Sequence, residues 1–148
     1  MCDEIEAVCL EVNKPNSKPF VVISCYRPPS YNPSKFFEYI ETIINNGLDS
    51  GDREMYILCD LNCNMLPSKN TVPNAQFLSL CELYQLEQLI KNPTRITVQS
   101  KTLIDVILTN TSQRIVSSGV LHLGISDHSL VYAIRKISIP YKATHEIK

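Results

Sequence analysis

The 148-residue chain has no tryptophan and only four glycines, and three other absences say more about its class. No apolar run approaches the roughly 20 residues that a membrane-spanning helix needs. The acidic start, Met1 to Glu4, lacks the basic and apolar regions of a secretory signal peptide. With a net charge of -1, the chain has no overall positive field to attract nucleic acid. We therefore expect a protein of the nucleus or cytoplasm that is not secreted and has no membrane partner.

Cysteine pairs of the CxxC type are also missing, although the chain contains six cysteines. Their spacing disfavours a zinc site, and their share of the composition is too low for a disulfide scaffold. Cys9, Cys25 and Cys59 each lie in an apolar run, where we expect them to be small buried hydrophobes. Free thiols of this kind are typical of a reducing compartment.

The overall composition predicts one globular domain. Hydrophobic residues make up 44% and charged residues 20% of the chain, as in an ordinary soluble protein with a single core. We expect this domain to span residues 1–138 and a polar tail, 139–148, to fray.

Strands and helices alternate along the chain, and several strands are apolar throughout. The run 20–26 is nearly all apolar, which predicts a strand buried on both faces. Asn32 and Pro33 suit a helix start and Gly47 suits its end. A second helix is expected over 74–86. Further strands are expected over 5–12, 55–59, 103–108, 115–123 and 129–137. This mixture predicts an α/β or α+β fold with helix-covered sheets.

Polar residues interrupt the chain at the edges of these apolar strands, where a rigid sheet could hold a functional site. Asp60 and Asn62 follow one strand, although an Asp-x-Asn sequence is equally well explained as a turn. Asp105 lies inside an apolar strand, where a carboxylate is costly to bury unless it is paired or bound to metal. His128 follows Asp127, and an adjacent acid can orient an imidazole, although a lone histidine is more often structural. The candidate site residues are Tyr26, Asp60, Asn62, Asp105, Asp127 and His128.

The order of these residues closely resembles the endonuclease/exonuclease/phosphatase family. The nearest resemblance is to the endonuclease domains of non-LTR retrotransposons, carried by Tyr26-Arg27-Pro28-Pro29 and by the segments 88–97 and 102–110. It covers the chain from about Ile5 to Lys136. The resemblance implies part of a four-layered α/β sandwich of the deoxyribonuclease-like type.

Catalytic roles also follow from the resemblance. It implies that Asp60 and Asn62 handle the attacking water and the transition-state phosphate, and that Tyr26 contacts the scissile phosphate. Asp105 would orient His128, and His128 would donate a hydrogen bond to a phosphate oxygen. Phosphodiester hydrolysis needs such donors aimed at the developing charge.

The same resemblance implies a divalent cation, Mg²⁺ or Mn²⁺. Its predicted ligands are Asp60, Asn62 and Asp127, and carboxylate and amide oxygens suit these hard cations. Asn62 and His128 would contact the substrate phosphate, and the implied substrate and partner is DNA.

Two departures from the family pattern bear on activity. Cys59 replaces the glycine that the family places before the Asp-x-Asn acid. The family fold begins with about a hundred further residues, including an Asn and a metal-binding Glu, so we expect this chain to be the C-terminal portion with N-terminal strands missing.

Three functions therefore stay open. The first is DNA nicking by the endonuclease domain of a longer, reverse transcriptase-associated parent polypeptide. The second is a catalytically inactive truncated remnant or interaction module, and the third is a phosphatase of the same family. Lys91, Arg95, Lys101 and Arg114 could form a phosphate-binding rim or be ordinary solvated charges.

Overall fold

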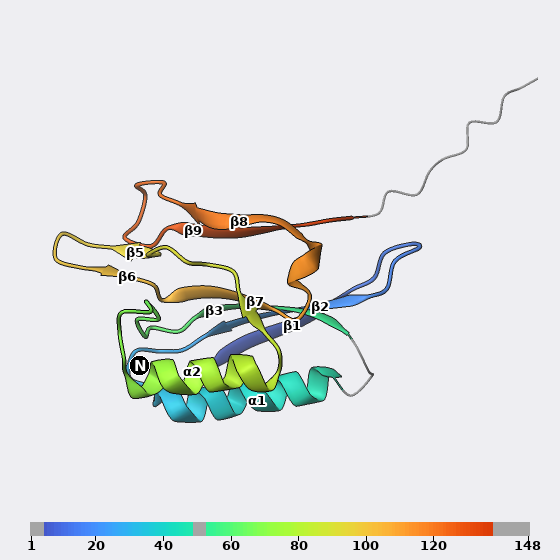
Figure 1. Ribbon diagram of the computed structural model, residues 1–148, viewed down its shortest axis with the longest axis horizontal. Helices are drawn as coiled ribbons and strands as arrows, with labels where there is room; N and C mark the ends of the chain where they lie inside the picture. The colour runs from blue at the N-terminus through green and yellow to red at the C-terminus, as the bar shows by residue number, and fades with distance from the viewer. Residues whose placement is uncertain (1–4, 49–52, 138–148) are drawn as a thin grey trace, which may run out of the picture.

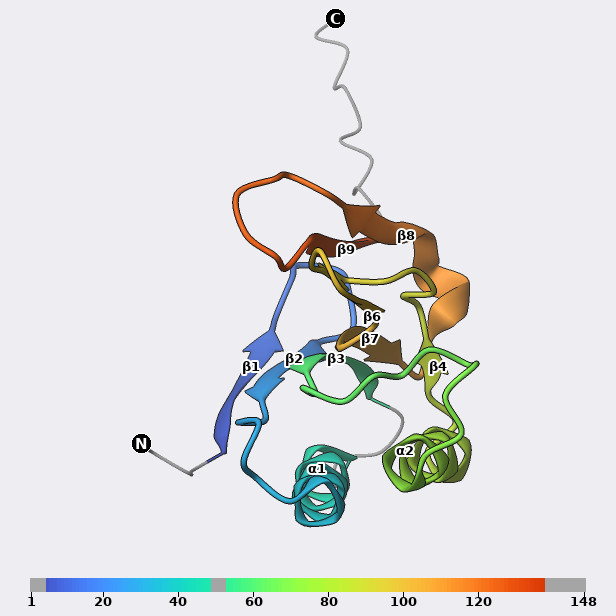
Figure 2. The ribbon, with the colours of Figure 1, turned by 90° about the vertical axis from the view of Figure 1, so that its left-hand side faces the viewer.

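The computed structural model describes residues 5–48 and 53–137. They form three layers, with two helices on one face of a central sheet and a two-stranded sheet on the other (Figure 1; Figure 2). The helices are α1, Pro33–Leu48, and α2, Val72–Leu83, and a short 3-10 turn covers Ser112–Arg114. The strands are β1 Glu6–Val12, β2 Phe20–Tyr26, β3 Glu54–Asp60, β4 Glu87–Gln88, β5 Arg95–Ile96, β6 Lys101–Thr102, β7 Asp105–Thr109, β8 Ile115–Leu121 and β9 Leu130–Arg135.

The central sheet is mixed, with the strand order β1-β2-β3-β7-β4. Strands β2 and β3 are parallel and α1 connects them, as a parallel pair requires a crossover. The other neighbours in this sheet pair antiparallel. The ends of β2 and β3 therefore lie at the same edge, and β7 begins there. The predicted α/β class is confirmed.

The helical layer buries one face of the central sheet. Val21, Ile23 and Cys25 alternate along β2 and are each at most 5% exposed. From α1, Phe36 and Ile44 pack into the same core and are fully buried. The predicted helix start is confirmed, because the Asn32 side chain accepts a hydrogen bond from the Lys35 backbone N–H at 3.2 Å. Gly47 was predicted to end the helix, but α1 continues to Leu48.

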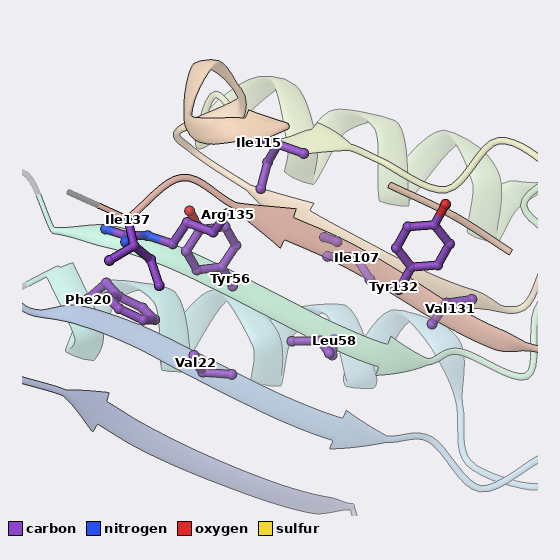
Figure 3. Close-up of a pocket in the computed structure, with 11 residues that line it drawn as sticks. Phe20, Val22, Tyr56, Leu58, Ile107, Ile115, Val131, Tyr132, Arg135 and Ile137 are labelled. Atoms are coloured by element: carbon purple, nitrogen blue, oxygen red, sulfur yellow. The ribbon is translucent and has the colours of Figure 1, made fainter. Parts of the chain in front are cut away.

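The opposite face of the sheet is covered only in part. The β8–β9 hairpin lies over β3 and β7 and leaves an apolar cavity of about 460 Å³ beneath it (Figure 3). Val8 and Leu10, on β1, are each 57% exposed. The prediction that 20–26 is buried on both faces is therefore wrong, because Ser24 is exposed where the second sheet does not reach.

The edge position of β1 also explains the one cysteine that was placed wrongly. Cys25 and Cys59 are buried as expected, whereas Cys9 is exposed. Cys9 is the register partner of Ile23 and faces the helical layer, but β1 lies at the edge of the sheet. An apolar run identifies a strand without saying whether its faces are covered.

A buried ion pair fastens β9 to the central sheet. Glu54, at the start of β3, accepts hydrogen bonds from Arg135 of β9, at 2.5 Å from Nε and 2.8 Å from Nη2. The Arg135 guanidinium also lies 4.4 Å from the ring centroid of Phe20. Tyr56 donates its hydroxyl to the same carboxylate. This network closes one end of the cavity.

Several boundaries differ from the sequence-based expectations because pairing is decided by distant residues. The second helix covers 72–83 rather than 74–86, and the expected strand over 103–108 begins only at Asp105. The two-residue strands β4, β5 and β6 were not predicted. The expected frayed tail, 139–148, lies outside the described residues. No helix within 5–48 or 53–137 is long and apolar enough to cross a membrane.

Candidate active site

Three neighbouring strands place polar side chains in one row at one edge of the central sheet. Tyr26 ends β2 and is the register partner of Asp60, which ends β3. Asp60 is in turn the partner of Asp105, which begins β7. Register partners project to the same face of a sheet, so the three side chains share the face opposite the helices.

His128 joins this row from the loop between β8 and β9. Its Nδ1 lies 3.2 Å from Asp105 Oδ2 and 3.3 Å from Asp105 Oδ1. Asp105 is thus placed to fix the orientation of the imidazole, which leaves Nε2 for a substrate or ligand.

Thr94 connects the strand that carries Asp105 to the loop that carries His128. This side chain is fully buried, and its hydroxyl accepts hydrogen bonds from the backbone N–H groups of Ile104, at 3.1 Å, and Asp105, at 3.0 Å. Its carbonyl accepts a hydrogen bond from the Ser129 N–H at 2.7 Å. One residue therefore sets the distance between the acid and the histidine.

Asp60, Asp105 and His128 form a group with the character of a cation site. One ligand atom from each lies within 4.8 Å of the others. Burial raises the pKa of Asp60, and the Asp105 carboxylate raises it further. The Asn62 backbone N–H, 3.0 Å from Asp60 Oδ1, acts in the opposite direction. A carboxylate whose charge is disfavoured by burial and by a second acid, beside an imidazole, suits a divalent cation.

Asn62 and Asp127, the other two predicted metal ligands, are engaged elsewhere. Asp127 accepts a hydrogen bond from Arg95 Nε at 2.6 Å, and this contact lowers the pKa of Asp127. The Asn62 side-chain amide donates to the Arg27 carbonyl oxygen at 2.8 Å. Their roles as ligands stay predictions.

The suggested phosphate-binding rim does not form one group. Arg95 lies beside the site, through its pair with Asp127. Arg114 lies 3.5 Å from Glu54, at the opposite end of β3 from Asp60. A rim that includes Arg114 is therefore wrong.

The sequence analysis did not identify Thr94 or Arg27 as parts of the site. Both belong to segments that carried the family resemblance, but each bonds to backbone groups of distant residues that lie near it only in the folded chain. A buried arginine and a buried threonine have no distinguishing pattern in one sequence.

The chain was compared with protein families, curated proteins and solved structures. A family model described as "Endonuclease-reverse transcriptase" matches residues 20–132. No curated protein matches the chain in sequence.

Solved structures share the fold at low sequence identity. The endonuclease domain of TRAS1, a telomere-specific non-LTR retrotransposon, matches with a TM-score of 0.77 and 16% identity, over 90% of this chain and 64% of that chain. An endonuclease/exonuclease/phosphatase family protein from Leptotrichia buccalis matches with a TM-score of 0.66 and 16% identity, over 88% of this chain and 54% of that one. A mannosyl-6-phosphatase of Bacteroides thetaiotaomicron matches with a TM-score of 0.54 and 11% identity, over 80% and 52% of the two chains. The chain thus spans between about half and two thirds of each.

Proposed function

Because the chain belongs to the endonuclease–reverse transcriptase family, whose members are nuclease-type hydrolases, we propose that it contributes to divalent-metal-dependent nicking of DNA. The observation that carries this proposal is the convergence of Asp60, Asp105 and His128 within 4.8 Å, at the strand end that also holds Tyr26 and Asn62. Acids and an imidazole around one point suit the hydrolysis of a phosphodiester.

Asp60 and Asp105 are the carboxylates that would hold Mg²⁺ or Mn²⁺, with the His128 ring beside them. When bound, the cation would neutralise charge on the phosphate oxygens. Asp60 is also proposed to orient a water molecule toward phosphorus. The half-buried setting of Asp60 excludes bulk solvent from one side, which strengthens the effect of each nearby donor.

His128 is proposed to donate a hydrogen bond from Nε2 to a non-bridging phosphate oxygen. Asp105 accepts a hydrogen bond from the Nδ1–H and so keeps the ring oriented for that task. Tyr26, on the same row, is proposed to bind the phosphate through its hydroxyl.

DNA is the proposed substrate, and the support is the likeness to the TRAS1 endonuclease domain. A second candidate is the removal of a terminal phosphate, since a mannosyl-6-phosphatase shares the fold. The family model favours the nuclease.

We propose that this chain needs additional polypeptide in order to be active. The chain spans 64% of the TRAS1 endonuclease domain, so part of that domain has no counterpart here. On β1, Val8 and Leu10 expose an apolar surface on the same face as the site row. We propose that polypeptide equivalent to the unmatched part, in a longer parent chain or a separate one, covers this face and completes the site.

The test is cleavage of supercoiled plasmid by the isolated chain and by the full product of its gene. We expect Mg²⁺-dependent nicking by the full product, abolished by His128→Ala and by Asp60→Ala. Glu87→Ala, an exposed acid on β4, is the matched control and should leave nicking unchanged. The isolated chain should cleave near background.

Four outcomes would overturn parts of this proposal. Full activity of the isolated chain would remove the need for further polypeptide. Cleavage that persists in EDTA would exclude the role of the cation. Release of phosphate from a sugar phosphate, without nicking, would favour the phosphatase, and no hydrolysis of either substrate would favour an inactive remnant.

A further inference from the structure

Arg27 is a buried charge for which the proposed chemistry has no use. Its side chain is 3% exposed, although arginine is rarely buried without a partner. Among the described residues it forms no ion pair with a carboxylate. Burial of an unpaired guanidinium is costly, so its contacts have to compensate for the lost water.

The contacts of Arg27 are backbone oxygens of two loops. One loop, 28–31, follows β2 and precedes α1, and the other, 61–63, follows β3. The acceptors are the carbonyl oxygens of Pro28, Pro29, Tyr31, Leu61 and Asn62. The Cys63 thiol lies 3.3 Å from Nη2. Three guanidinium nitrogens thus join two loops that are about thirty residues apart in sequence.

The backbone of Arg27 makes the same connection. Its N–H donates to the Asp60 carbonyl at 3.0 Å, and its carbonyl accepts from the Asn62 side-chain amide at 2.8 Å. Together with the side-chain contacts, Arg27 touches each of the four consecutive residues from Asp60 to Cys63.

Asn62 is the residue most dependent on these contacts. It has a backbone φ of 47°, in the left-handed region that few residues other than glycine adopt. Its N–H donates to Asp60, its carbonyl accepts from Arg27 Nη2 at 2.9 Å, and its side-chain amide donates to the Arg27 carbonyl. The strained turn is therefore held on both sides by one residue.

We propose that Arg27 is a positioning residue of the active site, which fixes the Asp60–Cys63 loop so that Asp60 and Asn62 face the substrate in one geometry. It acts through the loop and does not touch the reacting atoms. The planar guanidinium reaches both loops at once, and a lysine ammonium of similar charge cannot reproduce that fork. This role rests on the proposed function of the loop residues.

The first experiment does not depend on activity. Amide hydrogen exchange is measured by NMR in the isolated chain for the wild type, Arg27→Lys and Arg27→Gln. The Leu61 and Met65 N–H groups, which bond to the carbonyls of Ile104 at 2.8 Å and Leu103 at 2.7 Å, report opening of the loop. Amides of the central strand β3, such as Ile57, report unfolding of the whole domain.

We expect exchange at Leu61 and Met65 to rise roughly tenfold or more in both variants, relative to exchange at Ile57. Arg53→Lys is the matched control, because Arg53 pairs with Glu11 and lies at the other end of β3. A rise that is uniform across the loop and β3 would show a merely global role and would overturn the proposal.

The second experiment is nicking by the full gene product carrying Arg27→Lys. We expect kcat to fall roughly tenfold while KM for DNA stays within about twofold, because the loop positions the reacting groups and not the duplex. Local loop opening with unchanged kcat would overturn the positioning role. If the wild type shows no nicking, the proposed function fails, and the exchange experiment still decides whether Arg27 holds the loop.

Discussion

Replacement of Asp60 by asparagine is expected to stabilise the metal-free fold while it removes the proposed activity. Asp60 is half-buried, and its register partner on the next strand is a second acid, Asp105. Asparagine keeps an oxygen to accept the Asn62 N–H, which lies 3.0 Å away, but carries no charge. The substitution thus removes a charge that burial and Asp105 both disfavour.

The size of the effect follows from the fraction of Asp60 that water still reaches. Partial exposure limits the gain in the free energy of unfolding at pH 7 to about 1 kcal/mol, within the range of other stabilising substitutions. For a chain of this length that corresponds to a rise of about 3 °C in Tm.

The direction of the pKa shift of Asp60 determines how stability should change with pH. The folded state raises the pKa of Asp60 above its ordinary value of 3.8, so the folded state binds the proton more tightly than the unfolded state. Wild-type stability should therefore fall as the pH rises from that value through the folded-state pKa. The advantage of Asp60→Asn should be complete at neutral pH and should disappear in acid.

The assay is thermal unfolding by circular dichroism in EDTA from pH 3.5 to 7.5. Glu87→Gln, which neutralises an exposed acid, is the control and should change Tm little. If Asp60→Asn lowers the free energy of unfolding by 1 kcal/mol or more at pH 7, the reasoning is refuted, because the carboxylate would then stabilise the metal-free fold.

Three further predictions concern the rest of the fold. Arg135→Met should lower the free energy of unfolding by about 3–5 kcal/mol, because it leaves Glu54 buried without its main partner, and adding Glu54→Gln should recover part of the loss in urea unfolding. Thr94→Val should cost about 2–3 kcal/mol in the same assay, since the Asp105 N–H and its neighbour lose their acceptor, and an unchanged midpoint would contradict the role of Thr94. Cys9 should react with a thiol reagent under native conditions faster than the buried cysteines, as peptide mapping by mass spectrometry would show.

Strands β2 and β3 could be predicted from the sequence because each contains an almost unbroken run of apolar residues. The bounds of β2 were predicted as observed, and β3 extends one residue beyond the prediction at each end. The two-residue strands escaped prediction because their pairing depends on distant segments, as when β4 pairs with β7. Cys9 was placed wrongly because the run around it does not show that β1 lies at an edge.

The sequence indicated which residues belong to the candidate site, but it did not indicate how their side chains are oriented. Polar residues at strand ends indicated where Tyr26 and Asp60 would lie, since parallel strands end at one edge. Asp105 was expected inside a strand, and it instead begins β7, which runs antiparallel to β3. The orientation of a side chain in a loop depends on the residues that it contacts in the folded chain. Asp127 pairs with Arg95 for that reason, and no pattern around Asp127 indicates it.

Binding of Mn²⁺ tests the central claim most directly, because it asks whether a cation site lies at Asp60 and Asp105, beside His128. Substoichiometric Mn²⁺ is added to the isotope-labelled chain, and paramagnetic broadening of its NMR signals is mapped. The account predicts that signals at the ends of β2 and β3 and around His128 broaden first, and that Asp60→Asn largely removes this effect while Glu87→Gln does not. Broadening centred elsewhere, or the same broadening in Asp60→Asn, would contradict the assignment of the site.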